Sequence, residues 1–233
     1  VPFSPDNDGL EDELHIYLNV EDLVGVEEWS LNIKDPKGAD FYSFHGKGTP
    51  SNELVWDGLS DNGELVMAAE DYPWTFKAVD KVGNEAEKRG EIPVDILVIR
   101  DGDRLKIRIS SINFSPNSPE LVQDDEDIKE KNQQVLTRLA EILNKYKSHS
   151  IRIEGHAVSV YWSDPERAER EEEEELKPLS LARAKTVKQA LGKRGVREDR
   201  IQVRGLGGTE PLVPHSDLDN RWKNRRVEFI LVR

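Results

Sequence analysis

The end of one expected strand offers the clearest place for a binding site. Residues 151–157 alternate apolar and charged side chains as a half-buried strand does, and this strand runs into Gly155 and His156. A Gly-His pair at a strand end is a common place to build a binding site. Here Ala157 and Val158 follow, and neither side chain can ionise or accept a hydrogen bond.

A second candidate lies near the start of the chain, where the stretch DNDGLED places carboxylates at short spacings. Asp6, Asp8 and Asp12 offer the hard oxygen ligands that Ca²⁺ prefers. The stretch lacks the bidentate glutamate that closes an EF-hand loop at its twelfth position, where Tyr17 stands. Two interpretations stay open, a calcium site or a capped, solvated turn before the first strand.

Other kinds of chemistry find no support in the sequence. The chain has no cysteine, which excludes disulfides and thiolate metal sites but leaves the redox compartment undecided. No histidines stand at a metal-binding spacing, and there is no nucleophile elbow or phosphate-binding glycine loop. The five histidines are His15, His45, His149, His156 and His215. We therefore expect no enzymatic activity and, apart from the calcium alternative, no cofactor.

Charge divides the chain into two halves. Residues 1–100 hold 8 Lys and Arg against 22 Asp and Glu, whereas residues 101–233 hold 25 against 24. This asymmetry predicts two domains with different surroundings. We expect no nucleic-acid partner, because phosphate binding needs a basic face and the net charge is −13. The short basic stretch at 220–226 is more typical of a solvated turn or a small-anion site.

The sequence also bears on the membrane and on the extent of the chain. No apolar run approaches the about 18 residues of a membrane span, so we expect none in this segment. No signal peptide is visible at Val1. We expect a fragment or mature form from which an upstream part, with any export signal or lipid anchor, has been removed.

Residues 1–98 are expected to form an immunoglobulin-like β-sandwich. Strands alternate at 13–20 and 29–35, and turn signals such as DPKG, SDNG and DKVGN separate further short apolar stretches. Several strands of this spacing in about 100 residues favour that architecture. Residues 56–84, with WDG, YPWTF and DKVGN in order, also resemble the Ig-like domains beside flagellar-hook-cap and gliding-motility proteins. Such domains act mostly as spacers or adhesive modules.

Residues 99–233 are expected to form a second domain of the α+β class, with the boundary near 98–103. The hydrophobic period changes between 2 and 3.6 along this half, which predicts the order β-α-β-α-β-β with helices on one sheet face. We expect the second helix to start at an N-cap, Ser180, and to stop at Gly195. The expected elements are strands at 104–114, 151–157, 200–205 and 226–232, and helices at 124–147 and 180–195.

Five stretches of this half, taken in order, resemble the OmpA-like C-terminal domain. They are INFSPNS, IRIEGH, LSLARAKTVKQAL, RIQVRGLGGTEPL and NRRVEFIL, within about 105–233. That domain is the peptidoglycan-associated module of outer-membrane proteins, peptidoglycan-associated lipoproteins and motor stator proteins. The resemblance implies a βαβαββ fold and a site for wall peptides.

The resemblance also implies which residues form that site. In the family the strand ends Gly-His-Thr-Asp, and its aspartate and the arginine of the LSxxRA helix clamp the amine and carboxylate of diaminopimelate. In this chain the arginine is Arg183, whereas the aspartate position holds Val158. The other positions that match the family's pocket are Asn113, Phe114, His156, Asn224 and Arg226. A degraded or re-specialised peptidoglycan site follows.

An acidic insertion at about 159–178 precedes the LSxxRA helix. It contains the run Glu171–Glu175 and is expected to be a solvated helix. Two functional interpretations stay open. Asp164 or one of the glutamates replaces the missing carboxylate, or Tyr161 and Trp162 occupy the pocket or present an aromatic contact surface.

Together these observations predict a non-enzymatic structural protein of a double-membraned bacterium's envelope. We expect it in the periplasm and associated with the outer membrane, with other envelope proteins as partners and weak or no binding to peptidoglycan. One alternative is a retained peptidoglycan tether that uses Arg183 and a substitute acid. Another is a calcium-dependent adhesive or assembly module centred on Asp6, Asp8 and Asp12.

Overall fold

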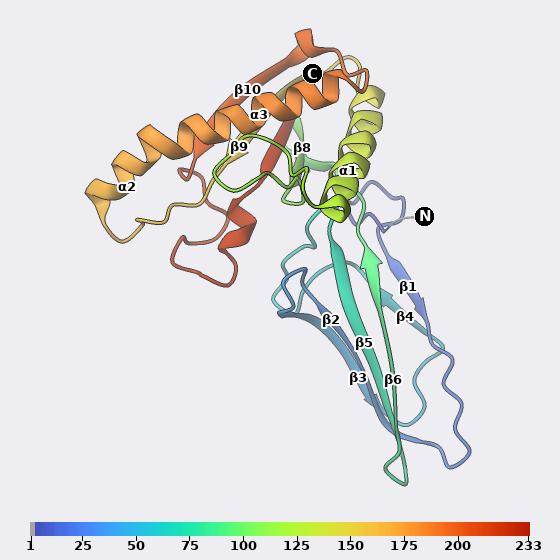
Figure 1. Ribbon diagram of the computed structural model, residues 1–233. Helices are drawn as coiled ribbons and strands as arrows, with labels where there is room; N and C mark the ends of the chain where they lie inside the picture. The colour runs from blue at the N-terminus through green and yellow to red at the C-terminus, as the bar shows by residue number, and fades with distance from the viewer. Residues whose placement is uncertain (1–2) are drawn as a thin grey trace. The chain divides into compact units, whose positions relative to one another are not determined.

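The computed structural model describes residues 3–233 and divides the chain into two compact units (Figure 1). The first unit ends at Leu97 and the second begins at Val98. None of the helices in residues 3–233 combines the length and the apolar content that crossing a bilayer requires.

The first unit is built from two antiparallel sheets. The larger has the order β3-β2-β5-β6, and the smaller pairs β1 with β4. The strands are β1 (Leu14–Tyr17), β2 (Val26–Lys34), β3 (Asp40–Lys47), β4 (Glu53–Trp56), β5 (Asp71–Asp80) and β6 (Glu85–Pro93).

Side-chain alternation explains why these two sheets pack together. Leu31 of β2 and Phe76 of β5 are register partners and lie buried in one apolar cluster. Ile16 of β1 and Leu54 of β4, which also pair, pack against that cluster from the smaller sheet. Two sheets thus pack on one apolar cluster, whereas the immunoglobulin-like sandwich stays a prediction.

The second unit has one five-stranded sheet of order β10-β9-β11-β8-β7. Only the pair β9 and β10 is parallel. The unit is of the expected α+β type, with the additional short edge strand β7. The strands are β7 (Ile99–Asp101), β8 (Arg104–Ile109), β9 (Ser150–His156), β10 (Ile201–Gly207) and β11 (Val227–Val232). The helical segments are α1 (Glu126–Lys145), α2 (Pro165–Glu171), η1 (Glu172–Leu176), α3 (Lys177–Gly192), η2 (Glu198–Arg200) and η3 (Arg221–Asn224).

Two glycines let α3 lie close to the sheet. A Cβ on Gly155 of β9 would overlap with the carbonyl oxygen of Ser180 and lie 2.9 Å from its carbonyl carbon. A Cβ on Gly205 of β10 would in the same way meet the backbone of α3, at Lys177 and Leu181. The helix therefore crosses two neighbouring parallel strands at the points where they carry no side chain, and this contact fixes the height of α3 above the sheet.

The prediction that Ser180 caps the second helix was wrong. The helix begins at Pro165, capped by the Asp164 side chain, and runs through η1, a π-helical turn, into α3. Ser180 is buried inside α3, where its hydroxyl donates to the Lys177 carbonyl (3.1 Å) and accepts from the Gly207 N–H (3.0 Å). Asp164 followed by proline is a good start signal, but the charged run after it was expected to form a separate insertion. That insertion is helical, as expected.

Candidate functional site

The side chain of Arg183 lies at the centre of the candidate site. It projects from α3 to the loop after β8, where its Nε donates to the Ser118 carbonyl (3.0 Å). Its guanidinium lies over the ring of Phe114, 5.0 Å from the centroid. A hydrogen bond and a cation–π contact thus fix the orientation of the fork.

The loop that carries Phe114 is held by a buried asparagine of α1. Asn132 accepts a hydrogen bond from the Asn113 N–H (2.8 Å) and donates one to the Asn113 carbonyl (2.9 Å). The Asn113 side chain donates to the carbonyl of Ser111 (2.7 Å), so it stabilises the conformation of the loop. Sequence reasoning missed Asn132. The available signal was a polar residue on the apolar face of a helix, in step with Ile128 and Val135.

Arg183 has no counter-charge among the described residues 3–233. Within residues 3–233 no carboxylate pairs with Arg183, and its two terminal nitrogens make no hydrogen bond. Burial, and then the charge of Arg225, lower the pKa of Arg183, although it stays protonated at neutral pH. The arrangement is therefore suited to an anion, for which the guanidinium fork offers two parallel donors.

Val158, which stands where the family has an aspartate, lies just beyond the end of β9. The Ala157 N–H donates to the Gly207 carbonyl (2.7 Å), which continues the strand pairing up to the half-buried Val158. From there the chain enters a loop that is organised by Glu171. The buried Glu171 carboxylate accepts hydrogen bonds from the Ser159 hydroxyl (2.7 Å) and from the N–H groups of Val160 (3.0 Å) and Tyr161 (3.2 Å).

A second glutamate of the acidic run also folds back onto the sheet. Glu172 accepts a hydrogen bond from the Gly208 N–H (2.8 Å) through Oε2, while its Oε1 is buried and has no hydrogen-bond partner among residues 3–233. It lies beside Gly207, the register partner of His156, where any side chain at 207 would overlap with it. Glu171 and Glu172 therefore turn inward, whereas the side chains of Glu173–Glu175 are exposed.

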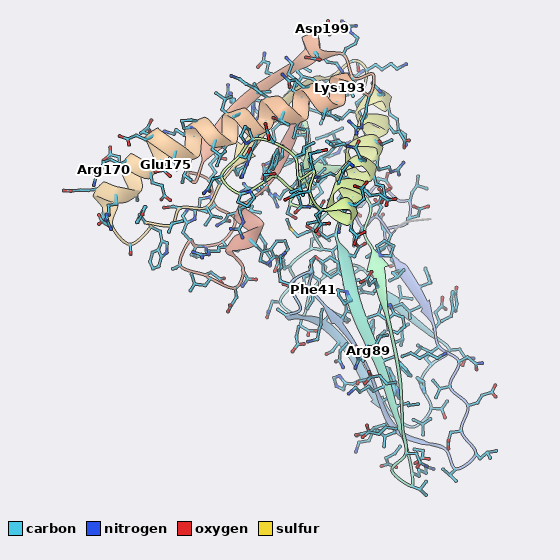
Figure 2. The ribbon with its side chains drawn as sticks, viewed as in Figure 1. Phe41, Arg89, Arg170, Glu175, Lys193 and Asp199 are labelled. Carbon is cyan, nitrogen blue, oxygen red and sulfur yellow. The ribbon has the colours of Figure 1, made fainter. Side chains whose placement is uncertain are left out.

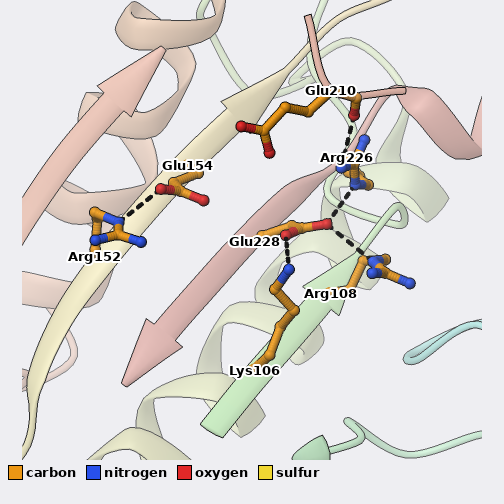
Figure 3. Close-up of polar contacts among 7 residues, drawn as sticks. All are labelled: Lys106, Arg108, Arg152, Glu154, Glu210, Arg226 and Glu228. Atoms are coloured by element: carbon orange, nitrogen blue, oxygen red, sulfur yellow. Dashed lines mark hydrogen bonds and ion pairs between the residues drawn. The ribbon is translucent and has the colours of Figure 1, made fainter. Parts of the chain in front are cut away.

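An ionic network lies on the sheet around the buried Glu228 (Figure 3). Glu228 of β11 accepts from Arg226 Nε (2.7 Å) and Arg108 Nε (2.9 Å), and its second oxygen pairs with Lys106 Nζ (2.9 Å). Burial by itself raises the pKa of Glu228, but the cations outweigh it and hold the pKa at about 2. The carboxylate is thus ionised at any physiological pH.

His156 lies beside this network, with a ring nitrogen within 4.8 Å of a Glu228 oxygen. Its side chain is buried, both ring nitrogens lack a hydrogen-bond partner within the described chain, and its backbone N–H donates to the Arg226 carbonyl (3.0 Å). Burial, and then the charge of Arg226, lower the pKa of His156 to about 4, so the ring is neutral at pH 7.

The geometry alone would allow a metal ion at this point, but the charges oppose it. Ligand atoms of Glu154, His156 and Glu228 lie within 4.8 Å of one another. Glu154, however, binds Arg152 (2.6 Å), and Glu228 is shared by three cations. A divalent cation would have to displace these partners and then lie beside them, so the cluster is better explained as a structural ion network.

The structure distributes the remaining predicted residues over different roles. Asn224 is fully buried and holds the loop before η3, because it accepts from the N–H groups of Leu212 (2.7 Å) and Val213 (3.1 Å) and donates to the Val213 carbonyl (2.8 Å). Arg226 belongs to the ionic network and also donates to the Glu210 carbonyl (3.1 Å). Asn113, Phe114 and Arg183 are brought together, whereas His156 and Arg226 form a separate buried group.

The three aspartates of the first unit also converge. Carboxylate oxygens of Asp6, Asp8 and Asp12 lie within 4.8 Å of one another. Asp12 accepts hydrogen bonds from the N–H groups of Asn7 (2.6 Å) and Gly9 (2.8 Å), and Asp8 accepts from Leu10 (2.8 Å). The loop is thus ordered by its own backbone donors, as in a capped turn.

Comparison with known protein families identifies part of the second unit. The model of the OmpA family matches residues 115–225. Residues 115–225 are an OmpA-family domain. The resemblance expected from the five sequence stretches is thereby confirmed. The match contains Arg183, Val158 and the acidic insertion, while Asn113, Phe114 and Arg226 lie just outside its ends.

Relatives of the OmpA-family domain come from several bacteria. The chain is 27% identical over 136 residues to the probable lipoprotein YiaD of Escherichia coli K12. This match covers 58% of this chain and 55% of YiaD. It is 44% identical over 54 residues to the peptidoglycan-binding protein ArfA of Mycobacterium tuberculosis H37Rv, covering 23% of this chain and 17% of ArfA. The chain thus spans about half of YiaD and under a fifth of ArfA.

Two solved structures are similar to the second half of this chain. A putative MotB-like protein from Desulfovibrio vulgaris is 27% identical, with a TM-score of 0.48, over 59% of this chain and 81% of that one. The cell wall anchor of the T6SS from Pseudomonas aeruginosa is 24% identical, with a TM-score of 0.43, over 59% of this chain and 87% of that one.

Proposed function

We propose that this chain is a non-enzymatic structural protein of the bacterial cell envelope whose wall-peptide site has been re-specialised. Its place would be the periplasm, in association with the outer membrane. One observation carries the proposal: Arg183 is held in place by Phe114 and Ser118, yet no carboxylate of the described chain accompanies it. Membership of the OmpA family and the name of the relative ArfA support a site for wall peptides.

The chemistry of such a site follows from its charges. The guanidinium fork binds a carboxylate through two parallel hydrogen bonds. An ammonium group next to that carboxylate would meet the charge of Arg225, and the family's acid position holds Val158 in this chain. Leaving a buried charge unanswered costs about 2–5 kcal/mol, and about 3 kcal/mol weakens binding roughly hundred-fold. The site therefore favours a carboxylate without a neighbouring amine over diaminopimelate.

The experiment is calorimetric titration with a muropeptide that contains diaminopimelate. We expect the native chain to give little or no heat and Val158→Asp to bind at least ~100-fold more tightly, because the acid answers the ammonium. Arg183→Gln in the Val158→Asp background should abolish that binding. Pimelate and diaminopimelate, which differ only in the two amines, provide a matched pair of small probes, and the native chain should prefer pimelate.

Retained binding through a substitute acid is the alternative, and the structure narrows its candidates. Each Glu171 oxygen already accepts a hydrogen bond from the 159–161 loop, whereas Oε1 of Glu172 is buried and receives none from the part of the chain that the structure describes. Micromolar binding of the muropeptide by the native chain, abolished by Arg183→Ala, would show that the site is not degraded. Glu172→Gln would then decide whether Glu172 supplies the acid.

The first unit is proposed to be an immunoglobulin-like spacer or assembly module over 1–98, followed by the OmpA-like domain over 99–233. The packing of two sheets supports this. A calcium-dependent adhesive module is a second candidate, favoured by the convergence of Asp6, Asp8 and Asp12. A ligand that binds only the folded state raises the melting temperature. Calcium should then stabilise the native chain but not Asp8→Asn, and equal responses would exclude this site.

A further inference from the structure

Three consecutive apolar side chains point into water directly after the candidate site. Val160 is 65% exposed, Tyr161 43% and Trp162 45%. Single exposed apolar residues are ordinary, but a contiguous group that includes two aromatic side chains is typical of an interaction surface. These residues belong to the acidic insertion, and within residues 3–233 none of them forms a hydrogen bond or cation–π contact with Arg183.

The loop of these three residues, 160–162, is held in a defined conformation. The buried Glu171 carboxylate binds the backbone N–H groups of Val160 and Tyr161 and so fixes where the loop leaves β9. Arg167 of α2 lies over the Tyr161 ring, 5.1 Å from its centroid. Ordering the loop in advance lowers the conformational entropy that a partner would otherwise have to remove on binding.

The helical run that follows the loop is acidic, because residues 164–177 hold eight Asp and Glu against three Lys and Arg. Glu173, Glu174 and Glu175 are exposed on η1, and of these Glu173 pairs with Lys177. Figure 2 shows Glu175 on the same long helix as Arg170, which lies at its far end. Wall peptides carry free carboxylates, so an acidic surface would repel them, whereas a cationic polypeptide would be attracted.

We propose that the loop 160–162 and the exposed glutamates of η1 form a docking surface for a basic segment of a second protein, which inserts an apolar side chain against Trp162. The aromatic and aliphatic side chains supply the buried contact. The glutamates supply charge complementarity, which selects the partner and speeds its association. This role is independent of the site at Arg183 and goes beyond the proposed function.

The test uses three fluorescently labelled peptides of equal length, composed of Lys and Leu, Lys and Ser, or Glu and Leu. Fluorescence anisotropy measures their binding to the full chain. We expect the Lys/Leu peptide to bind best. Trp162→Ser should weaken it at least ~10-fold, as loss of a central aromatic anchor does. Glu174→Gln/Glu175→Gln should weaken it less and flatten its salt dependence.

Two matched controls keep the result specific. Leu218→Ser removes an exposed apolar side chain elsewhere in the second unit, and Glu27→Gln/Glu28→Gln removes the same charge from exposed positions in the first. Both should bind like the native chain. The proposal is overturned if the Lys/Ser peptide binds as tightly as the Lys/Leu peptide, or if Trp162→Ser leaves binding unchanged. It is also overturned if Trp162→Ser reduces retention on purified peptidoglycan and not peptide binding.

Discussion

Neutralising Glu228 should remove a large part of the stability of the second unit at neutral pH. The carboxylate is 2% exposed and is shared by Arg226, Arg108 and Lys106. Lowering its pKa from 4.5 to about 2 corresponds to roughly 3 kcal/mol of stabilisation of the folded state. Glu228→Gln leaves three cations around a neutral amide, so we expect a loss of about 3 kcal/mol at pH 7.

The pH dependence supplies an independent test of the same reasoning. A carboxylate with a depressed folded-state pKa stabilises the protein above its unfolded pKa, and this stabilisation disappears as the pH falls through the folded value. For Glu228 the window runs from about 4.5 down to about 2. The difference between native and Glu228→Gln should therefore be constant from pH 7 to about 5 and then shrink.

Hydrogen exchange of the amides in β9 and β11 measures the stability of the second unit separately from the first. Urea is the preferred denaturant for a parallel measurement, because it does not screen charges. Glu141→Gln is the control, since Glu141 pairs with Arg138 on the surface and should cost under about 1 kcal/mol. A loss below 1 kcal/mol for Glu228→Gln at pH 7, or a difference that persists down to pH 2, would refute the proposed role of the network.

Three further predictions follow from other parts of the second unit. Gly155→Ala should cost about 1–3 kcal/mol of unfolding free energy in urea, because α3 must move. A Cβ at Gly208 would meet no backbone, only the side chains of Glu172 and His215 at 3.3 Å, so Gly208→Ala should cost less. Equal costs would argue against the close contact of α3 with the sheet. Glu171→Ala should lower the free energy of unfolding by about 1–3 kcal/mol and shift the NMR amide signals of residues 159–161. An unchanged spectrum would contradict the role of Glu171 in holding that loop. Because the pKa of His156 is lowered to about 4, the unfolded state binds a proton at a higher pH than the folded state does. The native chain should therefore lose stability as the pH falls from 6.5 to 4, and His156→Gln should lack this loss. The same pH profile of stability for both proteins would contradict the burial of a neutral His156.

The order of elements and the family were predictable because they depend on local patterns. Alternation marked β8 and β9, and the apolar stripe with Leu139 and Leu143 marked α1. The position of Arg183 followed from its motif, and the structure places it against Phe114, another residue carried over from the family. Strands and helices can be predicted from sequence because their apolar side chains recur every two or every 3.6 residues.

The remaining features depend on contacts between distant residues. Arg108 and Glu228 are 120 positions apart, so their ion pair becomes visible only once β8 and β11 are in register. Within the run of glutamates, no local pattern distinguishes Glu171 and Glu172, which fold inward, from the exposed ones that follow. The π-helical turn decides this, because it changes which side chains face the sheet.

The place of β11 in the sheet has a consequence for how the second unit is made. β11 is the last strand in chain order, yet it lies between β8 and β9 and pairs with both. Before it is added, β8 and β9 have no common neighbour, and most of the apolar face under α1 and α3 cannot close. During synthesis the unit must therefore wait for residues 227–232. High contact order of this kind makes folding slow and leaves the nascent chain dependent on being kept unaggregated in the meantime.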